Sequence, residues 1–312
     1  MFIDRLITNI KKLDNPTVIG LDPKLEYIPA YIREKAYGEY GTGFTGIAEA
    51  VIQFNKKLID AVYDLVPAVK PQLAYYEMYG LDGMRAFVET CAYARSKGML
   101  IIADGKRNDI GTTAEAYSAA FLGKVPAGVC ECAVFDADAL TVNPYLGYDG
   151  VKPFIEDCKK YGKGIFILVK TSNKSSGQLQ DIITQEGKTI FETVAELVNE
   201  WGGDTVGENG YSSIGAVVGA TYPEQAKVLR KIMKKAYILV PGYGAQGGTA
   251  KDAVHSFNSD GLGAVINASR SIMCAWKAER WSEHYCEGAF DSAARAEVIR
   301  MRDEIKEALA AR

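Results

Sequence analysis

The sequence predicts a single (β/α)8 barrel, and three observations support this prediction. Eight short runs rich in β-branched and apolar residues recur along the 312 residues, and each leads into polar or glycine-containing loop sequence. Helical patterns lie between these runs. Strands that are apolar almost throughout are typical of parallel sheets covered by helices. We therefore expect one barrel domain over residues 1–312, with loop insertions and a C-terminal helix.

The expected strands follow one another at intervals that leave room for helices. They cover residues 17–22 (TVIGLD), 68–75 (AVKPQLAY), 99–106 (MLIIADGK), 138–144 (DALTVNP), 164–171 (GIFILVKT), 213–221 (SIGAVVGAT), 237–244 (YILVPGYG) and 263–269 (GAVINAS). An open, doubly wound sheet is the alternative architecture. No GxGxxG motif follows an early strand, however, and no repeat of a half-domain is evident.

The helices are indicated by apolar residues at steps of three or four. The clearest patterns cover 44–65 and 187–201, and weaker ones cover 81–97, 113–122, 150–161, 222–235 and 249–258. From residue 288 onward, one apolar face marks a closing helix. A typical barrel has about 250 residues, and the surplus is assigned to this helix and to insertions near 23–43, 122–137, 172–186 and 202–212.

The composition excludes several classes of protein. Apolar residues make up 48% of the chain and charged residues 24%, the balance of a globular protein with a sizeable core. The net charge is −3, unlike that of a strongly basic nucleic-acid binder. No stretch of about 18 consecutive apolar residues occurs, so we expect no membrane-spanning segment.

The cysteines and histidines bear on compartment and on metal binding. Six cysteines occur without a CxxC pair and without a secretory leader, so we expect a reduced, cytoplasmic protein. His255 and His284 are isolated from other groups at ligand spacing. We therefore expect neither a metal site nor a Ser-His-Asp triad, and no cofactor is indicated.

The end of the third predicted strand carries an unusual group of charges. Asp104 and Lys106 are two residues apart and lie on the same side of an extended strand, and Asp109 follows in the loop. Active sites of barrels lie at this end of the strands. Buried charges need partners, and Lys70 in the second strand is the natural candidate. The four form an alternating array, which could also be a structural salt-bridge network.

Two later loops indicate a phosphate site. The run from Pro241 to Gly248 (PGYGAQGG) supplies small residues whose backbone N–H groups can approach an anion, and Arg270 after the eighth strand adds a guanidinium. The loops after strands seven and eight are where barrels frequently hold phosphate.

With these motifs the sequence resembles the orotidine 5′-monophosphate decarboxylases, particularly their longer bacterial-type members. The most specific part is the DxKxxD run that begins at Asp104 and continues as Ile110-Gly111-Thr112-Thr113. The segments GLDP at 20–23 and SRS at 269–271 also occur in the expected order. DxKxxD occurs as well in related sugar-phosphate decarboxylases and synthases of the same superfamily, so the combination of motifs carries the resemblance.

The resemblance implies cofactor-free release of CO2 from orotidine monophosphate to give uridine monophosphate in pyrimidine synthesis. Lys106 would protonate C6 as the carboxylate leaves, and Asp104 would sit beside that carboxylate. Lys70 would fix Asp104 and reach the ribose, while Asp22 would hold a ribose hydroxyl.

The resemblance also implies further substrate contacts and a homodimer. Ser172 would read the pyrimidine edge, and Gln246 and Arg270 would hold the phosphate, with Pro241 and Gly247 in the same substrate-binding loop. In this family Asp109 and Thr113 cross a dimer interface into the neighbour's site.

Two rival functions remain open at this stage. Lys170, at the end of the fifth strand, could form a Schiff base in an aldolase, although an ordinary ion-paired lysine is the simpler interpretation. A catalytically silent nucleotide-binding protein would keep the phosphate site, but it would not need the lysine and aspartate array. Residues 173–180 are a candidate lid. Asn143-Pro144-Tyr145 could form a turn, part of the pocket wall or a substrate contact, and we expect it to contribute to the wall. Asp136 and Asp138 are expected to be capping or solvated groups.

Overall fold

Eight parallel strands close into a barrel, which confirms the predicted fold class. In the computed structural model, which describes residues 1–244 and 247–312, the strands lie in the order β1-β10-β9-β8-β7-β6-β3-β2 around the barrel. They are β1 (Thr17–Leu21), β2 (Ala68–Pro71), β3 (Leu100–Arg107), β6 (Ala139–Val142), β7 (Gly164–Lys170), β8 (Ser212–Val218), β9 (Ala236–Val240) and β10 (Ala264–Ala268). Each pairs in parallel with both neighbours.

Helices surround the barrel, as the apolar periodicity predicts. The longer ones are α3 (Phe44–Val62), α5 (Gly80–Ser96), α6 (Gly111–Phe121), α7 (Tyr148–Tyr161), α9 (Ile190–Trp201), α10 (Pro223–Ile232) and α14 (Phe290–Ala310). Short helices are α4 (Ala74–Glu77), α8 (Gly177–Gln180), α11 (Ala250–Ala253), α12 (Arg270–Met273) and α13 (Glu279–Ser282). Short 3-10 turns occupy Leu25–Tyr27, Lys174–Ser176, Gly203–Thr205, Val254–Ser256, Ala275–Lys277 and Glu287–Ala289.

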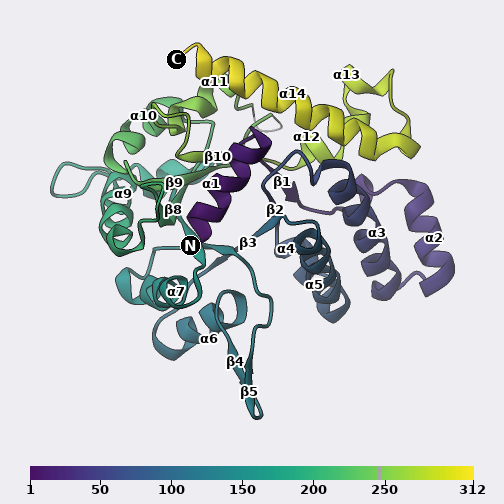
Figure 1. The fold of residues 1–312 in the computed structure, drawn as a ribbon, viewed down its shortest axis with the longest axis horizontal. Helices are drawn as coiled ribbons and strands as arrows, with labels where there is room; N and C mark the ends of the chain where they lie inside the picture. The colour runs from purple at the N-terminus through teal and green to yellow at the C-terminus, as the bar shows by residue number, and fades with distance from the viewer. Residues whose placement is uncertain (245–246) are drawn as a thin grey trace.

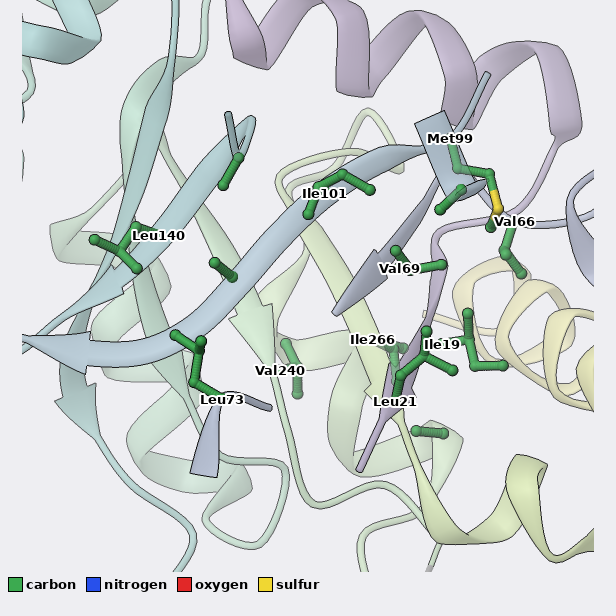
Figure 2. Packing of buried hydrophobic residues seen from close by; sticks show 14 of the residues in the cluster. Ile19, Leu21, Val66, Val69, Leu73, Met99, Ile101, Leu140, Val240 and Ile266 are labelled. Atoms are coloured by element: carbon green, nitrogen blue, oxygen red, sulfur yellow. The ribbon is translucent and has the colours of Figure 1, made fainter. Parts of the chain in front are cut away.

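Strand residues alternate between two buried layers, which explains why the strands are apolar throughout. Ile19, Val69 and Ile101 belong to the layer between strands and helices, part of which Figure 2 shows. Val18 and Ile102 belong to a second cluster inside the barrel. Both faces of each strand are therefore removed from water, as in other parallel sheets.

The N-terminal helix closes one end of the barrel. Helix α1 (Phe2–Leu13) crosses the barrel in Figure 1, and its apolar face joins the interior cluster. The ring of Phe2 packs edge-on against Phe166 of β7 at 6.0 Å between centroids. A Cβ on Gly164 would lie 2.2 Å from the Phe2 ring, so a glycine is required there. With this end filled, a site has room only at the opposite end of the barrel.

Two of the expected insertions contain secondary structure of their own. Helix α2 (Ala30–Tyr40) lies within the insertion near 23–43, and a protruding hairpin of β4 (Val125–Ala127) and β5 (Cys130–Cys132) lies within the insertion near 122–137 (Figure 1).

The expectation for Asp138 is wrong. Asp138 is buried rather than solvated. It accepts the backbone N–H of Ile101 at 2.9 Å and pairs with Arg5 at 2.8 Å, so it joins α1 to the barrel wall.

None of the helices in residues 1–244 and 247–312 is long and apolar enough to span a membrane. The longest of them, α14, packs through its apolar face against the outside of the barrel domain, including helix α3. Phe290 at its start is fully buried and stacks on Phe54 of α3, with 5.1 Å between ring centroids.

This contact predicts a large loss of stability on truncation. Phe290→Ala should lower the free energy of unfolding by about 3–5 kcal/mol, since it opens a cavity between α14 and α3. Urea denaturation measures the effect. The control is Leu81→Ala on the 91% exposed Leu81, which should change stability by no more than about 0.5 kcal/mol. Equal effects of the two substitutions would contradict the proposed packing role.

Candidate active site

A cavity of about 550 Å³ opens at the carboxyl ends of the barrel strands. Its apolar side is formed by inward-facing strand residues, Leu168, Val217 and Leu239. Its polar side carries charged, hydroxyl and amide groups at or just after the strand ends, namely Asp22, Lys70, Gln72, Asp104, Lys106, Thr141, Ser172, Asn267, Ser269 and Arg270. This is the end of the barrel at which (β/α)8 enzymes place their chemistry.

The carboxylate of Asp104 is the centre of the charged side. Its Oδ2 lies 2.7 Å from Nζ of Lys70, and its Oδ1 lies 2.6 Å from Nζ of Lys106. Asp104 and Lys70 are buried, whereas the Lys106 side chain is 44% exposed and so reaches the open part of the cavity. The sequence prediction that these three residues lie together agrees with this geometry.

Two further residues complete the hydrogen bonds of Asp104. Gln72 Nε2 donates to Oδ2 at 2.9 Å, and Thr141 Oγ1 donates to Oδ1 at 2.8 Å. Sequence reasoning missed both, although each carried a signal. Gln72 is two residues after Lys70 at the end of β2, and Thr141 is a hydroxyl residue within the apolar strand β6.

The backbone at Lys106 is strained. Its φ of 47° lies in the left-handed region, and the register between β3 and β6 is irregular from Ala103 to Arg107. The Lys106 N–H donates to Thr141 Oγ1 at 2.9 Å, which holds this conformation. Non-glycine residues in such conformations cluster at functional sites, where the surrounding contacts maintain them.

Electrostatics keep the Lys70–Asp104 pair ionised. Burial by itself would raise the pKa of Asp104, but the charges and hydrogen bonds of Lys70 and Lys106 outweigh it and hold that pKa well below its usual range. Burial would lower the pKa of Lys70, and the negative charges of Asp104 and Asp22 raise it instead. The site therefore presents a fixed carboxylate between two ammonium groups.

Two acceptor oxygens of residues that line this cavity lack a hydrogen-bond partner. Within the described residues, Asp22 Oδ1 and Asn267 Oδ1 are buried and have no hydrogen-bond partner. Both residues line the cavity. Buried acceptors without partners are costly, so a ligand hydroxyl or N–H group would satisfy them.

The expected phosphate loops lie at the cavity edge. Pro241, Gly242 and Arg270 line it. Gly242 adopts a φ of 93°, and Gly247 also has a φ of 93° but is exposed and outside the set of lining residues. Gln246, which the sequence assigns to the phosphate, lies outside the described residues.

The end of β7 contributes Thr171, Ser172 and Asn173 to the cavity. Ser172 packs closely on Gly219, where an added Cβ would lie 2.8 Å from the Ser172 Cβ. Lys170 does not line the cavity, because it is fully buried and pairs with Asp181 at 2.5 Å. This placement agrees with the ion-paired interpretation and removes the basis for a Schiff-base aldolase.

Some predicted residues lie apart from this cavity. Asp109 does not join the array within one chain; its Oδ1 accepts the N–H of Ile110 at 2.8 Å, and Thr113 is exposed on α6. The array is therefore a cluster of Lys70, Asp104 and Lys106.

The segment from Asn143 to Tyr145 does not line the cavity either, contrary to expectation. Asn143 Oδ1 accepts the N–H of Tyr145 at 3.0 Å, and Tyr145 is 75% exposed. The Asn143 side chain therefore stabilises the turn that follows β6, which explains why a polar residue stands there without lining the cavity.

The Asp104 cluster predicts a pH-dependent effect on stability. Asp104→Asn should lower the free energy of unfolding by about 3–5 kcal/mol at pH 7, because it leaves Lys70 buried without its ion pair. The ionised carboxylate stabilises the fold in full above its unfolded-state pKa near 3.8, and this contribution declines as the pH falls from that value toward the lower pKa of the folded state. Urea denaturation at pH 7 and pH 3 should show a smaller difference between the two proteins at pH 3. A difference that does not depend on pH would contradict an ionised Asp104.

Comparison with known proteins assigns the family. A family model described as "Orotidine 5'-phosphate decarboxylase / HUMPS family" matches residues 18–283. A protein of Caldicellulosiruptor saccharolyticus named orotidine 5′-phosphate decarboxylase is 45% identical over 276 residues, which cover 88% of this chain and 90% of its own. A protein of Clostridium acetobutylicum with the same name is 43% identical over 310 residues, which cover 99% of this chain and 100% of its own.

A solved structure agrees with this assignment. The Leishmania donovani OMP decarboxylase superposes with a TM-score of 0.72 at 28% identity and covers 100% of this chain and 99% of its own. Together with the DxKxxD run at the carboxyl end of β3, these similarities show that the chain belongs to the orotidine 5′-phosphate decarboxylase family.

Proposed function

We propose that this protein removes CO2 from orotidine 5′-monophosphate to give uridine 5′-monophosphate, with Lys106 as the proton donor to C6. The observation that carries the proposal is the contact of Lys106 with Asp104, which in turn is held by Lys70. Relatives that are 39–45% identical are named for this activity. The reaction is a step of pyrimidine biosynthesis and makes the protein a carboxy-lyase.

The chemistry explains why a lysine is needed at this position. Loss of CO2 from an sp2 carbon leaves a localised carbanion with no adjacent carbonyl to delocalise its charge. An ammonium group about 4 Å away stabilises that charge by about 4 kcal/mol at an effective dielectric constant of 20, or roughly three decades of rate. Lys106 then donates its proton to C6, combining electrostatic and general-acid roles.

Asp104 orients this lysine and faces the departing group. Its carboxylate stays ionised and therefore repels the carboxylate of the bound substrate. This repulsion disappears when CO2 leaves. Its partners Lys70, Gln72 and Thr141 prevent it from turning away. A rigid arrangement of this kind needs little reorganisation during the reaction.

The rest of the cavity matches the other parts of the nucleotide. Arg270 and the loop that begins at Pro241 suit the phosphate, and the carboxylate of Asp22, which lines the cavity and has one oxygen without a hydrogen-bond partner, suits a ribose hydroxyl. Ser172, which lines the cavity two residues after the end of β7, suits the pyrimidine. Binding of the phosphate and ribose supplies energy that holds C6 against Lys106.

We also propose a homodimer in which Asp109 and Thr113 enter the partner's site. The support is their position: both lie just beyond the catalytic end of β3 and outside the cavity of their own chain. As its compartment we propose the cytoplasm, since the six cysteines are free, as is usual where thiols are kept reduced.

Removal of the proposed proton donor should abolish turnover. Lys106→Ala should lower kcat/KM for orotidine 5′-monophosphate by about 10³-fold or more, because it removes the charge and the proton together. The fall in ultraviolet absorbance of the substrate measures the rate. Near wild-type turnover by a folded variant would refute the proton-donor role, and an inactive wild-type protein would favour a silent nucleotide-binding protein or another family activity.

Removal of the proposed phosphate contact should act chiefly on affinity. Arg270→Ala should raise KM by about 10- to 100-fold, the loss of a hydrogen bond to a charged group. Competitive inhibition by inorganic phosphate should weaken in parallel, while inhibition by uridine, which has no phosphate, should not change. Unchanged inhibition by phosphate would place the phosphate elsewhere.

Mixing two inactive variants tests the shared site. Lys106→Ala and Asp109→Ala should each be inactive alone, and mixed subunits should regain partial activity because one site of each heterodimer then has both residues intact. Sedimentation measures the dimer and the absorbance assay measures the rate. If heterodimers form but activity does not recover, Asp109 contributes to the site of its own chain or to no site.

A further inference from the structure

A second charged cluster lies outside the barrel wall, behind the cavity. Lys170, the last residue of β7, is completely buried, and its Nζ lies 2.5 Å from Oδ1 of Asp181. The same Nζ lies 4.6 Å from the ring centroid of Tyr222 and 5.5 Å from that of Phe191. Rings at these distances stabilise a cation.

An irregularity of β7 explains why Lys170 points outward. The pairing of β7 with β8 shifts between Leu168 and Lys170. Leu168 lies on the cavity side, so regular alternation would direct Lys170 inward as well. The shift turns Lys170 toward α9 and Tyr222 instead. Its charge is then held on the side of the wall opposite to the Asp104 cluster.

Asp181, the ion-pair partner of Lys170, lies at the end of a segment that begins at the cavity. Thr171, Ser172 and Asn173 line the cavity, and the chain then turns through α8 and returns to Asp181. Just before Asp181, Gln180 accepts the Thr171 N–H at 3.0 Å and donates to Thr171 Oγ1 at 2.8 Å. The two ends of the segment are therefore joined beside Lys170.

Tyr222 holds the middle of the same segment. Its hydroxyl donates to the carbonyl of Asn173 at 3.3 Å and accepts from Ser176 Oγ at 3.4 Å, while its ring contacts the Lys170 ammonium. The adjacent Thr221 Oγ1 donates to the carbonyl of Ser172 at 3.4 Å. These bonds hold backbone groups of residues 172 and 173, so they fix the direction of the two side chains.

We propose that Lys170 is a positioning residue for pyrimidine recognition: through its ion pair with Asp181 it fixes residues 171–181 so that Ser172 faces the base. The inference rests on the proposed function, since it assumes that the cavity holds a pyrimidine nucleotide. A buried ammonium needs its counter-charge, so Asp181 is drawn to this position and brings Gln180 with it. Lys170 acts without touching the substrate.

The test uses Asp181→Asn, because Asp181 is 46% exposed and its substitution keeps the size of the side chain. The probes are uridine 5′-monophosphate and ribose 5-phosphate, which lacks the base. Binding of the first should weaken about tenfold, the value of one well-placed hydrogen bond, while binding of the second should stay within about twofold. The KM for orotidine 5′-monophosphate should rise in parallel with the Kd for uridine 5′-monophosphate. An equal loss for both probes, or no loss for either, would overturn the proposal.

Two further variants address the mechanism. Lys170→Met removes the buried charge at similar volume and should show the same selective loss. In Ser172→Ala combined with Asp181→Asn, the loss should not exceed that of Ser172→Ala alone, because both changes remove the same contact. Fully additive losses would show that the ion pair acts elsewhere, and would contradict the proposal.

A matched control and the binding measurements separate the two hypotheses. Glu196→Gln breaks the exposed pair between Lys188 and Glu196 of helix α9, whose atoms lie 2.6 Å apart, and should leave the binding of both probes unchanged. Calorimetric binding does not require turnover. A wild-type protein that binds uridine 5′-monophosphate without decarboxylating its precursor would refute the proposed function and still allow the positioning role to be tested.

Discussion

Closure of eight parallel strands into one barrel is the constraint on which the rest of the structure depends. It buries both faces of every strand, so the walls must be apolar, and it brings all eight carboxyl ends to one rim. Helix α1 fills the other end with Phe2 and its neighbours. Of the described residues, the charged groups at the strand ends that include Lys70, Asp104 and Lys106 are therefore gathered around the cavity at this rim.

Within that cavity, the carboxylate of Asp104 organises the charges. It bridges Lys70 from β2 and Lys106 from its own strand, and Thr141 from β6 adds a third element. The strained backbone at Lys106 fits this arrangement, because the ion pair and the bond to Thr141 hold the residue where an unsupported chain would relax. Catalytic geometry and local stability are thus coupled through one carboxylate.

A second ion pair, between Lys170 and Asp181, serves the opposite face of the wall. It differs from the first in that its lysine faces aromatic rings rather than the cavity. Under the two proposals made above, the first cluster would serve the chemistry and the second would hold the segment that contacts the base.

The sequence by itself determined the barrel, the order of its eight strands and the cluster of Lys70, Asp104 and Lys106, because these follow from apolar periodicity, residue spacing and the need to pair buried charges. The second predicted strand, 68–75, is too long, since β2 ends at Pro71 and α4 begins at Ala74. It could not determine that Gln72 and Thr141 bind Asp104, because that depends on how neighbouring strands are staggered. The outward turn of Lys170 follows from a register shift, and the separation of Asp109 from the cavity follows from the path of the loop before α6. These features were decided by tertiary structure, since a shift of one residue in strand pairing reverses the face on which a side chain lies.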